Sequence, residues 1–223
     1  MQEILSSDSF LSPIIISLKV ATIATLLSLV IGIVLHYLIG QKSFPGKSII
    51  ETIIMLPMVL PPTVVGFILL ITLGKNSPVG KLIEQIFNQP IIFTIYAAIT
   101  ASTLVALPLM YQSLKIGIEQ VPHSIINAAI VDGAKKRQIF TNIILPLTKP
   151  ALLTGILLSF ARAIGEFGAT LIFAGNIPGI TETMPTAIYI AIENNEMTLA
   201  WGWVAIMITL SFMMMMATQL LRK

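Results

Sequence analysis

Five long runs of apolar residues divide this chain, and polar stretches separate them. The runs cover about residues 13–39, 50–73, 91–114, 150–174 and 199–221. A helix of roughly 20 residues crosses the hydrocarbon core of a membrane, so each run is long enough to span it. Because a helix satisfies its backbone hydrogen bonds without water, the pattern predicts helices throughout. We therefore expect an all-α polytopic membrane protein with five core transmembrane helices.

The composition agrees with this prediction. Hydrophobic residues make up 56% of the 223 residues and charged residues only 10%, with a mean hydropathy of +0.93. An ordinary soluble domain has about a quarter of its residues charged. The net charge of +3 does not by itself indicate a nucleic-acid partner, because the position of each basic residue matters more in such a chain. The absence of cysteine excludes disulfides and thiolate metal sites.

The distribution of lysine and arginine predicts the orientation of the helices. If the polar stretches alternate between two sides, nine basic residues fall on one side and two on the other, while Lys19 and Arg162 lie inside runs. Basic residues are enriched in cytoplasmic loops, so we expect the N-terminus outside and the C-terminus in the cytoplasm. The nine are Lys42, Lys47, Lys115, Lys135, Lys136, Arg137, Lys149, Arg222 and Lys223, and the two are Lys75 and Lys81.

The stretches between the runs predict how the chain is organised. We interpret residues 1–223 as a single transmembrane domain with a cytoplasmic loop at about 115–149. The segment "TMPTAIYIAIENNE", between the last two runs, is apolar over only about ten residues, which is too few for a crossing. We expect a short helix there, at the outer surface of the membrane.

The second run contains an unusual density of helix-breaking residues. Pro57, Pro61, Pro62 and Gly66 fall within about ten residues, and proline removes a backbone donor from a helix. A broken helix at membrane depth persists only against protein or beside a water-filled path. Two interpretations stay open, a kink that serves packing and a wall or gate of a translocation path.

The fourth run contains two charged residues, Arg162 and Glu166, where charges are costly. Their spacing of four residues allows an ion pair along a helix. In a continuous helix they share one stripe with Gly155, Ser159 and Ala169, which are small or polar. The pair is then either a structural lock for this helix or part of the translocation path, in which Arg162 meets a passing anion and Glu166 holds it in place.

The stretch at 115–149 contains two expected helices joined by a turn. Gly133 is suited to a left-handed cap at the end of the first, and the second ends near Leu145 and Pro146. The pattern reads Asn127-Ala128-Ala129, three residues ending in Asp132, then Gly133, nine residues, Ile143, one residue, and Leu145-Pro146.

This spacing resembles the cytoplasmic "EAA" loop of bacterial and archaeal ABC-importer permeases, with Asn127 in place of the usual glutamate. The resemblance implies a coupling helix that docks onto a separate ATP-hydrolysing subunit. It further implies a permease homodimer with two ATP-binding subunits and an external binding protein, embedded in the lipid of the cytoplasmic membrane. Asn127 lacks the charge of glutamate, so an ion pair at that interface is not expected.

Further segments are similar to the molybdate and tungstate permeases of the same family. They are "LPMVLPPTVVGF", "RAIGEFGATLIFAGNIPG" and "AIYIAIE". This resemblance implies import of molybdate, with tungstate as a second substrate, by alternating access. Sulfate and thiosulfate permeases share the Arg-Ala-hydrophobic-Gly-Glu core and are the alternative.

Two other classes of protein agree less well with the sequence than an importer permease does. A secondary transporter or channel acting alone is disfavoured because five helices do not divide into equal inverted repeats. A membrane enzyme is disfavoured because the sequence has no paired catalytic carboxylates and no metal-ligand cluster, and His36 and His123 are isolated. Gly46-Lys47-Ser48 resembles the end of a phosphate-binding loop, but Gln41 stands where that motif requires glycine. We therefore predict no catalytic residue, cofactor, metal or nucleic-acid partner.

Overall fold

The computed structural model describes residues 8–40 and 44–220, and all regular elements within these ranges are helical. The predicted cytoplasmic residues Lys42, Arg222 and Lys223 lie outside the described residues. The helices are α2 (Asp8–Leu35), η1 (His36–Gly40), α3 (Lys47–Val59), α4 (Pro62–Leu73), α5 (Pro78–Phe87), α6 (Ile95–Glu119), α7 (His123–Val131), α8 (Lys136–Ile139), η2 (Phe140–Ile144), α9 (Leu145–Leu147), α10 (Lys149–Ile164), α11 (Gly168–Ala174), α12 (Met184–Glu193) and α13 (Met197–Leu220).

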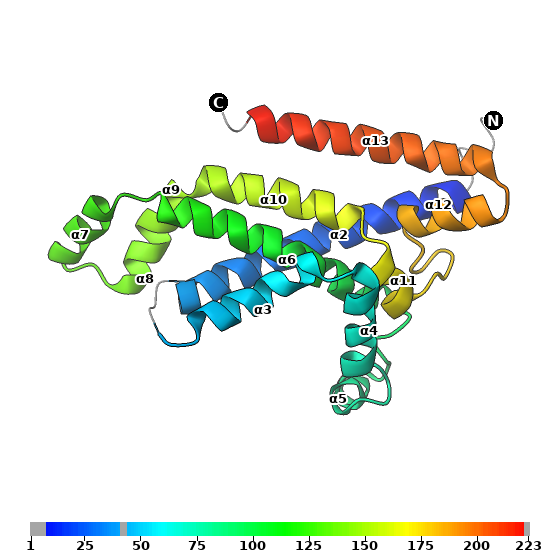
Figure 1. The fold of residues 1–223 in the computed structure, drawn as a ribbon, viewed down its shortest axis with the longest axis horizontal. Coiled ribbons are helices and arrows are strands. Elements are labelled where there is room, and N and C mark those ends of the chain that lie inside the picture. Colours follow the sequence, from blue (N-terminus) through cyan, green and yellow to red (C-terminus); the bar gives the residue numbers. More distant parts are fainter. Residues whose placement is uncertain (1–7, 41–43, 221–223) are drawn as a thin grey trace.

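Three of the predicted membrane helices are single helices. The segments Ser9–Gly40, Ile95–Glu119 and Met197–Leu220 are each long and apolar enough to cross a membrane. Helices α2 and α13 run in the same direction, so the beginning of α2 and the end of α13 lie at opposite ends of the molecule (Figure 1). This arrangement agrees with termini on opposite sides of the membrane.

The other two predicted membrane helices are broken. The chain bends by 116° between α3 and α4, so the run at 50–73 is not one straight span. Pro61 and Pro62 cause this break, because neither can donate a backbone hydrogen bond to the preceding turn. The strongly broken helix predicted from the prolines is therefore confirmed.

The fourth predicted span has different bounds from those expected. Helix α10 ends at Ile164, and α11 begins only at Gly168, so residues 150–174 do not form one continuous helix. At its other end α10 follows residues Lys136–Leu147 after a bend of 71°. If each bent pair counts as one crossing, the described chain has five candidate spans, as predicted.

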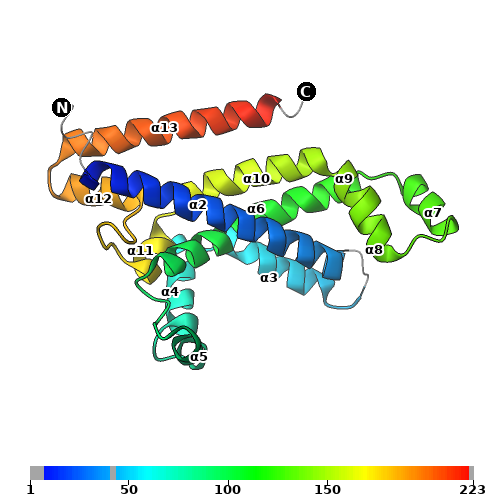
Figure 2. The same ribbon diagram turned by 180° about the vertical axis from the view of Figure 1, so that it is seen from behind.

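Helix α6 is the centre of the bundle and packs between α2 and α10 (Figures 1 and 2). Small side chains allow this close approach, which is typical of helices packed within a membrane. Two hydroxyl groups also bridge to its backbone: Ser28 Oγ donates to the Thr103 carbonyl at 3.2 Å and Ser159 Oγ donates to the Ala106 carbonyl at 3.3 Å. The fully buried small residues of α6 are Ala97, Ala98, Ala101, Ser102 and Ala106.

The predicted short helix of residues 184–193 is present as α12. The backbone N–H of Met184 donates to Ser17 Oγ at 2.7 Å, which ties the start of α12 to α2. Trp203 Nε1 donates to the Phe10 carbonyl at 2.9 Å, and the two rings stack. These contacts attach the beginning of α13 to the bundle, although most of α13 is exposed.

Two parts of the chain project from the bundle, as both ribbon views show (Figures 1 and 2). Helices α7 to α9, residues 123–147, extend beyond the ends of α6 and α10. We call them the cytoplasmic arm, because the sequence predicts this part of the chain on the cytoplasmic side. Helices α4 and α5 project from the side of the bundle. Helix α4 returns to it by packing against α11.

The contact between α4 and α11 depends on a glycine. A Cβ atom at Gly66 would lie 2.9 Å from Ala169 Cα and 3.0 Å from the Ala169 carbonyl oxygen, and backbone atoms cannot rotate away. Gly168 makes the reciprocal approach, because a Cβ there would lie 3.0 Å from Pro62 Cβ. The two broken spans are thus packed against each other at their breaks.

We predict that Gly66→Ala lowers the free energy of unfolding by about 1–3 kcal/mol, because overpacking this contact forces α4 and α11 apart. Gly165→Ala is the matched control, since its Cβ would meet only the Ala161 carbonyl oxygen at an ordinary 3.6 Å. Thermal unfolding of both variants in the same detergent measures the difference. Equal stability of the two variants would contradict the close packing.

Candidate functional site

The cytoplasmic arm begins with α7, whose end has the geometry predicted from Gly133. Gly133 has φ of 81°, a conformation that glycine adopts without a steric penalty. Its N–H donates to the Ile130 carbonyl at 3.0 Å, and the Ala134 N–H donates to the Ala129 carbonyl at 2.9 Å. These two bonds form a Schellman motif, which satisfies the last carbonyls of α7. Gly133 therefore turns the chain back toward the membrane.

The two alanines of the predicted docking motif lie on different faces of α7. Ala128 and Asn127 are exposed, whereas Ala129 is half-buried. Ala129 packs with Ile126 against a small apolar cluster inside the arm, formed by Ile139, Phe140 and Ile144. Ala128 is thus available to a partner, and Ala129 instead allows α7 to pack closely on its own chain.

The rest of the motif leads back to the bundle through α8, the π-helix η2 and α9, which are less regular than the single helix expected. The helical segment that begins at Lys136 passes through the π-helix η2 into α9 and ends at Leu147, before the bend at Thr148, so the predicted end near Leu145 and Pro146 is confirmed. Ile143 lines a surface hollow of about 340 Å³ together with Asp132 and Gly133. The structure therefore brings the two parts of the motif together and joins them directly to α10.

The second candidate site is the break between α10 and α11. Arg162 Nη1 lies 2.7 Å from Glu166 Oε2, so the predicted ion pair is present. The predicted stripe on one continuous helix is wrong, because Glu166 lies beyond the end of α10. Gly155, Ser159, Glu166 and Ala169 are nevertheless all buried.

Glu166 explains why the helix breaks at this point. Its Oε1 accepts a hydrogen bond of 2.9 Å from the backbone N–H of Ala169, one of the free donors at the start of α11. The side chain competes in this way with the backbone carbonyl that would accept the bond in a continuous helix.

The two members of the pair are in different environments. The Glu166 side chain is only 1% exposed, with one oxygen bonded to the backbone and the other paired with Arg162. The Arg162 side chain is 31% exposed. A guanidinium has five N–H donors in a planar fork, which matches the oxygens of an anion. Arg162 is therefore the member of the pair that can bind a further group.

The residues predicted to break the second span divide between two places. Pro62 and Gly66 contact the second break, at Gly168 and Ala169. Pro57 lies inside α3, and Pro61 precedes α4 and is exposed. The cytoplasmic arm, by contrast, lies at one end of the molecule, away from both breaks (Figure 1).

A cluster of charges around Glu51 was not predicted from the sequence. Lys115 Nζ lies 2.8 Å from Glu51 Oε2, although the residues are 64 positions apart. The available signal was an acidic residue just inside an apolar run with Lys47 four residues before it. Among the described residues, no group of three or more histidine, aspartate or glutamate side chains could hold a metal ion.

Comparison with known proteins gives concordant matches. The family described as "Binding-protein-dependent transport system inner membrane component" matches residues 28–223. YvgM of Bacillus subtilis (strain 168), named for molybdenum transport, is 50% identical over 215 residues, which cover 96% of this chain and 95% of that protein. The molybdenum transport system permease protein ModB of Escherichia coli (strain K12) is 39% identical over 180 residues, covering 81% of this chain and 79% of that protein.

A solved structure shares the fold. The crystal structure of a bacterial ABC transporter involved in the import of the acidic polysaccharide alginate matches with a TM-score of 0.76, over 99% of this chain and 81% of that chain. The sequence identity of 16% means that this likeness shows the fold alone.

We predict that Glu166→Ala is less stable than Glu166→Gln by about 1 kcal/mol, because glutamine can still accept the bond from the Ala169 N–H and alanine cannot. Both variants lose the ion pair with Arg162, and alanine also removes buried side-chain atoms, so about 1 kcal/mol is the smallest difference expected. Denaturant unfolding of the two proteins in mixed micelles provides the comparison. If their free energies of unfolding are equal, Glu166 does not cap α11.

Proposed function

This chain belongs to the family of binding-protein-dependent transport system inner membrane components, and we propose that it is the permease that imports molybdate, with tungstate as a second substrate. The observation that carries the proposal is its identity, over most of its length, to permeases named for molybdenum transport. The proposal treats residues 1–223 as one transmembrane domain.

The family defines the kind of machine in which the chain works. It is the multi-pass inner-membrane permease of an ABC importer, and an ATP-hydrolysing subunit and an external binding protein are its partners. Catalysis therefore belongs to a different subunit. We further propose that two copies of the permease assemble with two ATP-binding subunits and that the binding protein is specific for molybdate.

The outer face of α7 supports docking of the ATP-hydrolysing subunit. Ile125, Ala128 and Val131 are exposed there, with 86% of Val131 accessible. Ala128 allows a close approach of the helix backbone, and Gly133 and the turn after it hold α7 at a fixed angle to α8. Movement of the docked subunit would pass through α9 to α10, and rigid-body motion of this kind can alternate access between the two sides.

The broken span supports a permease homodimer with the path at its centre. None of the residues of α3 is buried, and the break at Pro61 is exposed. Irregular backbone at membrane depth requires protein or water rather than lipid beside it. A second copy facing α3 and α4 across a polar path meets this requirement.

Arg162 supplies the positive charge for an oxyanion at the second break. Glu166 is buried and already paired, so it acts as a brace that orients Arg162 and moderates its field. A moderated field suits a transporter, because an ion that binds too tightly is not released. In this proposal Glu166 has the structural role and Arg162 has the role in the translocation path, so the two roles considered for the pair are divided between its members.

Two alternative functions are import of sulfate and transport without ATP. Sulfate and molybdate are both tetrahedral dianions, and nothing in the residues around Arg162 distinguishes them by charge. A transporter that acts without ATP would not need the docking surface of α7. The acidic residues Glu182, Glu193 and Glu196 near α12 would repel a free dianion, which favours delivery by a bound protein.

We predict that Ala128→Asp weakens binding of the ATP-hydrolysing subunit at least about a hundredfold, because the new carboxylate is left unpaired in a close interface. Ala129→Asp should instead loosen the arm itself, because Ala129 packs against the cluster of Ile139 and Phe140. Binding titrations and hydrogen exchange of residues 123–147 separate the two effects.

Gln85→Asp on α5 is the control, since it adds the same charge to an exposed position far from the arm. Unchanged binding by the Ala128→Asp variant would contradict the docking assignment.

Uptake into proteoliposomes tests the substrate. We expect the complete assembly to take up radioactive molybdate in an ATP-dependent manner, with competition by unlabelled molybdate and tungstate at much lower concentrations than by sulfate. Preferential competition by sulfate would contradict the assignment of molybdate, and uptake without ATP would contradict an ABC importer.

A further inference from the structure

Helix α3 is held to the bundle without any buried side chain of its own. It packs on α6. Its far end leads into the 116° bend and the contact with the second break. A helix with so little buried surface depends on specific polar contacts for its position.

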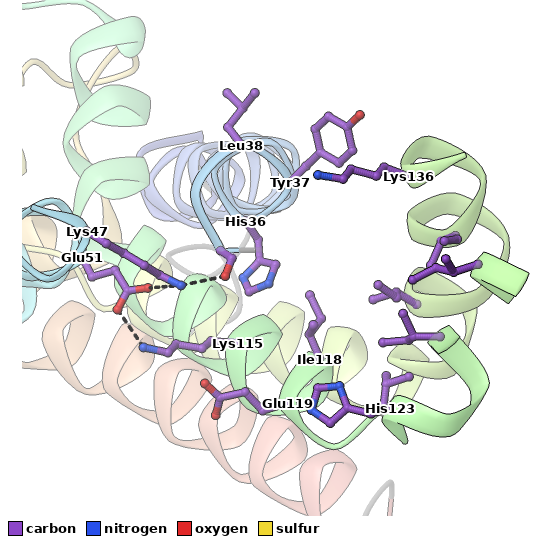
Figure 3. Close-up of a pocket in the computed structure, with 16 residues that line it drawn as sticks. His36, Tyr37, Leu38, Lys47, Glu51, Lys115, Ile118, Glu119, His123 and Lys136 are labelled. Atoms are coloured by element: carbon purple, nitrogen blue, oxygen red, sulfur yellow. Dashed lines mark hydrogen bonds and ion pairs between the residues drawn. The ribbon is translucent and has the colours of Figure 1, made fainter. Parts of the chain in front are cut away.

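Those contacts converge on Glu51, in the second turn of α3 (Figure 3). Glu51 Oε2 lies 2.8 Å from Lys115 Nζ, and Tyr111 Oη donates to Glu51 Oε1 at 3.2 Å; both partners lie on α6. Lys47 Nζ lies 3.8 Å from Glu51 and donates to the Gly40 carbonyl at 2.7 Å. Glu51 thus joins α3 to α6 and, through Lys47, to the end of η1.

The Glu51 side chain is only 18% exposed, so the strength of these contacts is not that of a surface ion pair. A carboxylate in this position is costly without its partners. Both lysines beside it are already occupied, by Glu51 and by the Gly40 carbonyl, so the cluster is not arranged to bind a further anion.

A cavity of about 530 Å³ separates this cluster from the cytoplasmic arm. His36, Lys47, Glu51 and Lys115 line one side of it (Figure 3). Side chains of the arm line the other, mostly isoleucines together with His123 and Lys136. The arm therefore does not rest directly on α3. It is connected to the end of α6, because α6 ends at Glu119 and α7 begins at His123, and its apolar cluster also packs against Ile33 of α2 and Tyr37 of η1.

We propose that Glu51 is the positioning residue that transmits movement of the cytoplasmic arm to the broken span. Lys115 lies one turn before the end of α6, the end at which displacement of the arm reaches this helix. The pair Lys115–Glu51 carries that displacement to α3, and the bend at Pro61 and Pro62 turns it toward the α4–α11 contact. The cavity leaves the arm free to move while the pair stays intact. This inference rests on the proposed function as an ATP-driven importer.

The test uses the complete importer with Glu51→Gln and Lys115→Met, singly and together. Glutamine keeps the size of the side chain and an acceptor for Tyr111, and it removes the charge and the oxygen that accepts from Lys115. We expect normal assembly and basal ATP hydrolysis, with molybdate imported per ATP hydrolysed reduced about tenfold in each single variant. The double variant should be no worse than either, and Glu51→Asp should recover most of the coupling.

Glu84→Gln is the matched control, because it breaks another glutamate–lysine pair, with Lys75, on the projecting α5 region. It should leave the ratio of molybdate to ATP unchanged. Normal coupling in Glu51→Gln would overturn the proposal. Loss of assembly in Glu51→Gln, or failure of Glu51→Asp to restore coupling, would also overturn it by assigning Glu51 a purely structural role.

A second measurement keeps this inference separate from the identity of the substrate. Spin labels at Met58 on α3 and Arg137 on α8, both exposed and outside the docking face of α7, should each change mobility when a non-hydrolysable ATP analogue binds the otherwise wild-type complex. In Glu51→Gln we expect only the label at Arg137 to change. If the wild-type complex shows these changes without importing molybdate, only the assignment of molybdate as substrate is contradicted. If the label at Met58 still changes in Glu51→Gln, the role of Glu51 is contradicted.

Discussion

A peptide group in hydrocarbon must find a hydrogen-bond partner within the protein, and this chain interrupts its helices twice in membrane-spanning segments. At the first break, Pro61 and Pro62 have no N–H to satisfy. At the second, the carboxylate of Glu166 accepts from the Ala169 N–H. The two breaks then pack on each other, through Gly66 against Ala169 and Gly168 against Pro62. The junction that results determines where α4, α10 and α11 lie.

The charge of Glu166 follows from the same constraint. A buried carboxylate is costly unless it is paired, and Arg162 pairs with it at 2.7 Å. The arginine is therefore required first for structure, and its remaining exposure makes it available to an oxyanion. The cytoplasmic arm reaches this junction by two connections: directly through α9 into α10, and through α6 and Glu51 into α3. An importer driven from its cytoplasmic side needs connections of this kind between the proposed docking site on α7 and the proposed path.

Much of this arrangement could be predicted from local sequence. The apolar runs gave the helical class and five candidate spans, the prolines gave the first break, and Gly133 gave the cap of α7. The second break was missed because residues 150–174 are apolar enough for a continuous helix, and only the competition of one side chain for a backbone donor interrupts it. The different roles of Ala128 and Ala129 and the pairing of Glu51 with Lys115 depend on tertiary packing, which no local pattern specifies.

The central claim is that the breaks border a polar path and not lipid. The chain has no cysteine, so a single introduced thiol reports on one position without background. Thr63, exposed just after the first break, and Ile208, exposed in the middle of α13, provide the comparison. In native membranes, Thr63→Cys should react with a charged, membrane-impermeant thiol reagent and Ile208→Cys should not. Equal protection of both positions would contradict the account, because it would place the first break in lipid.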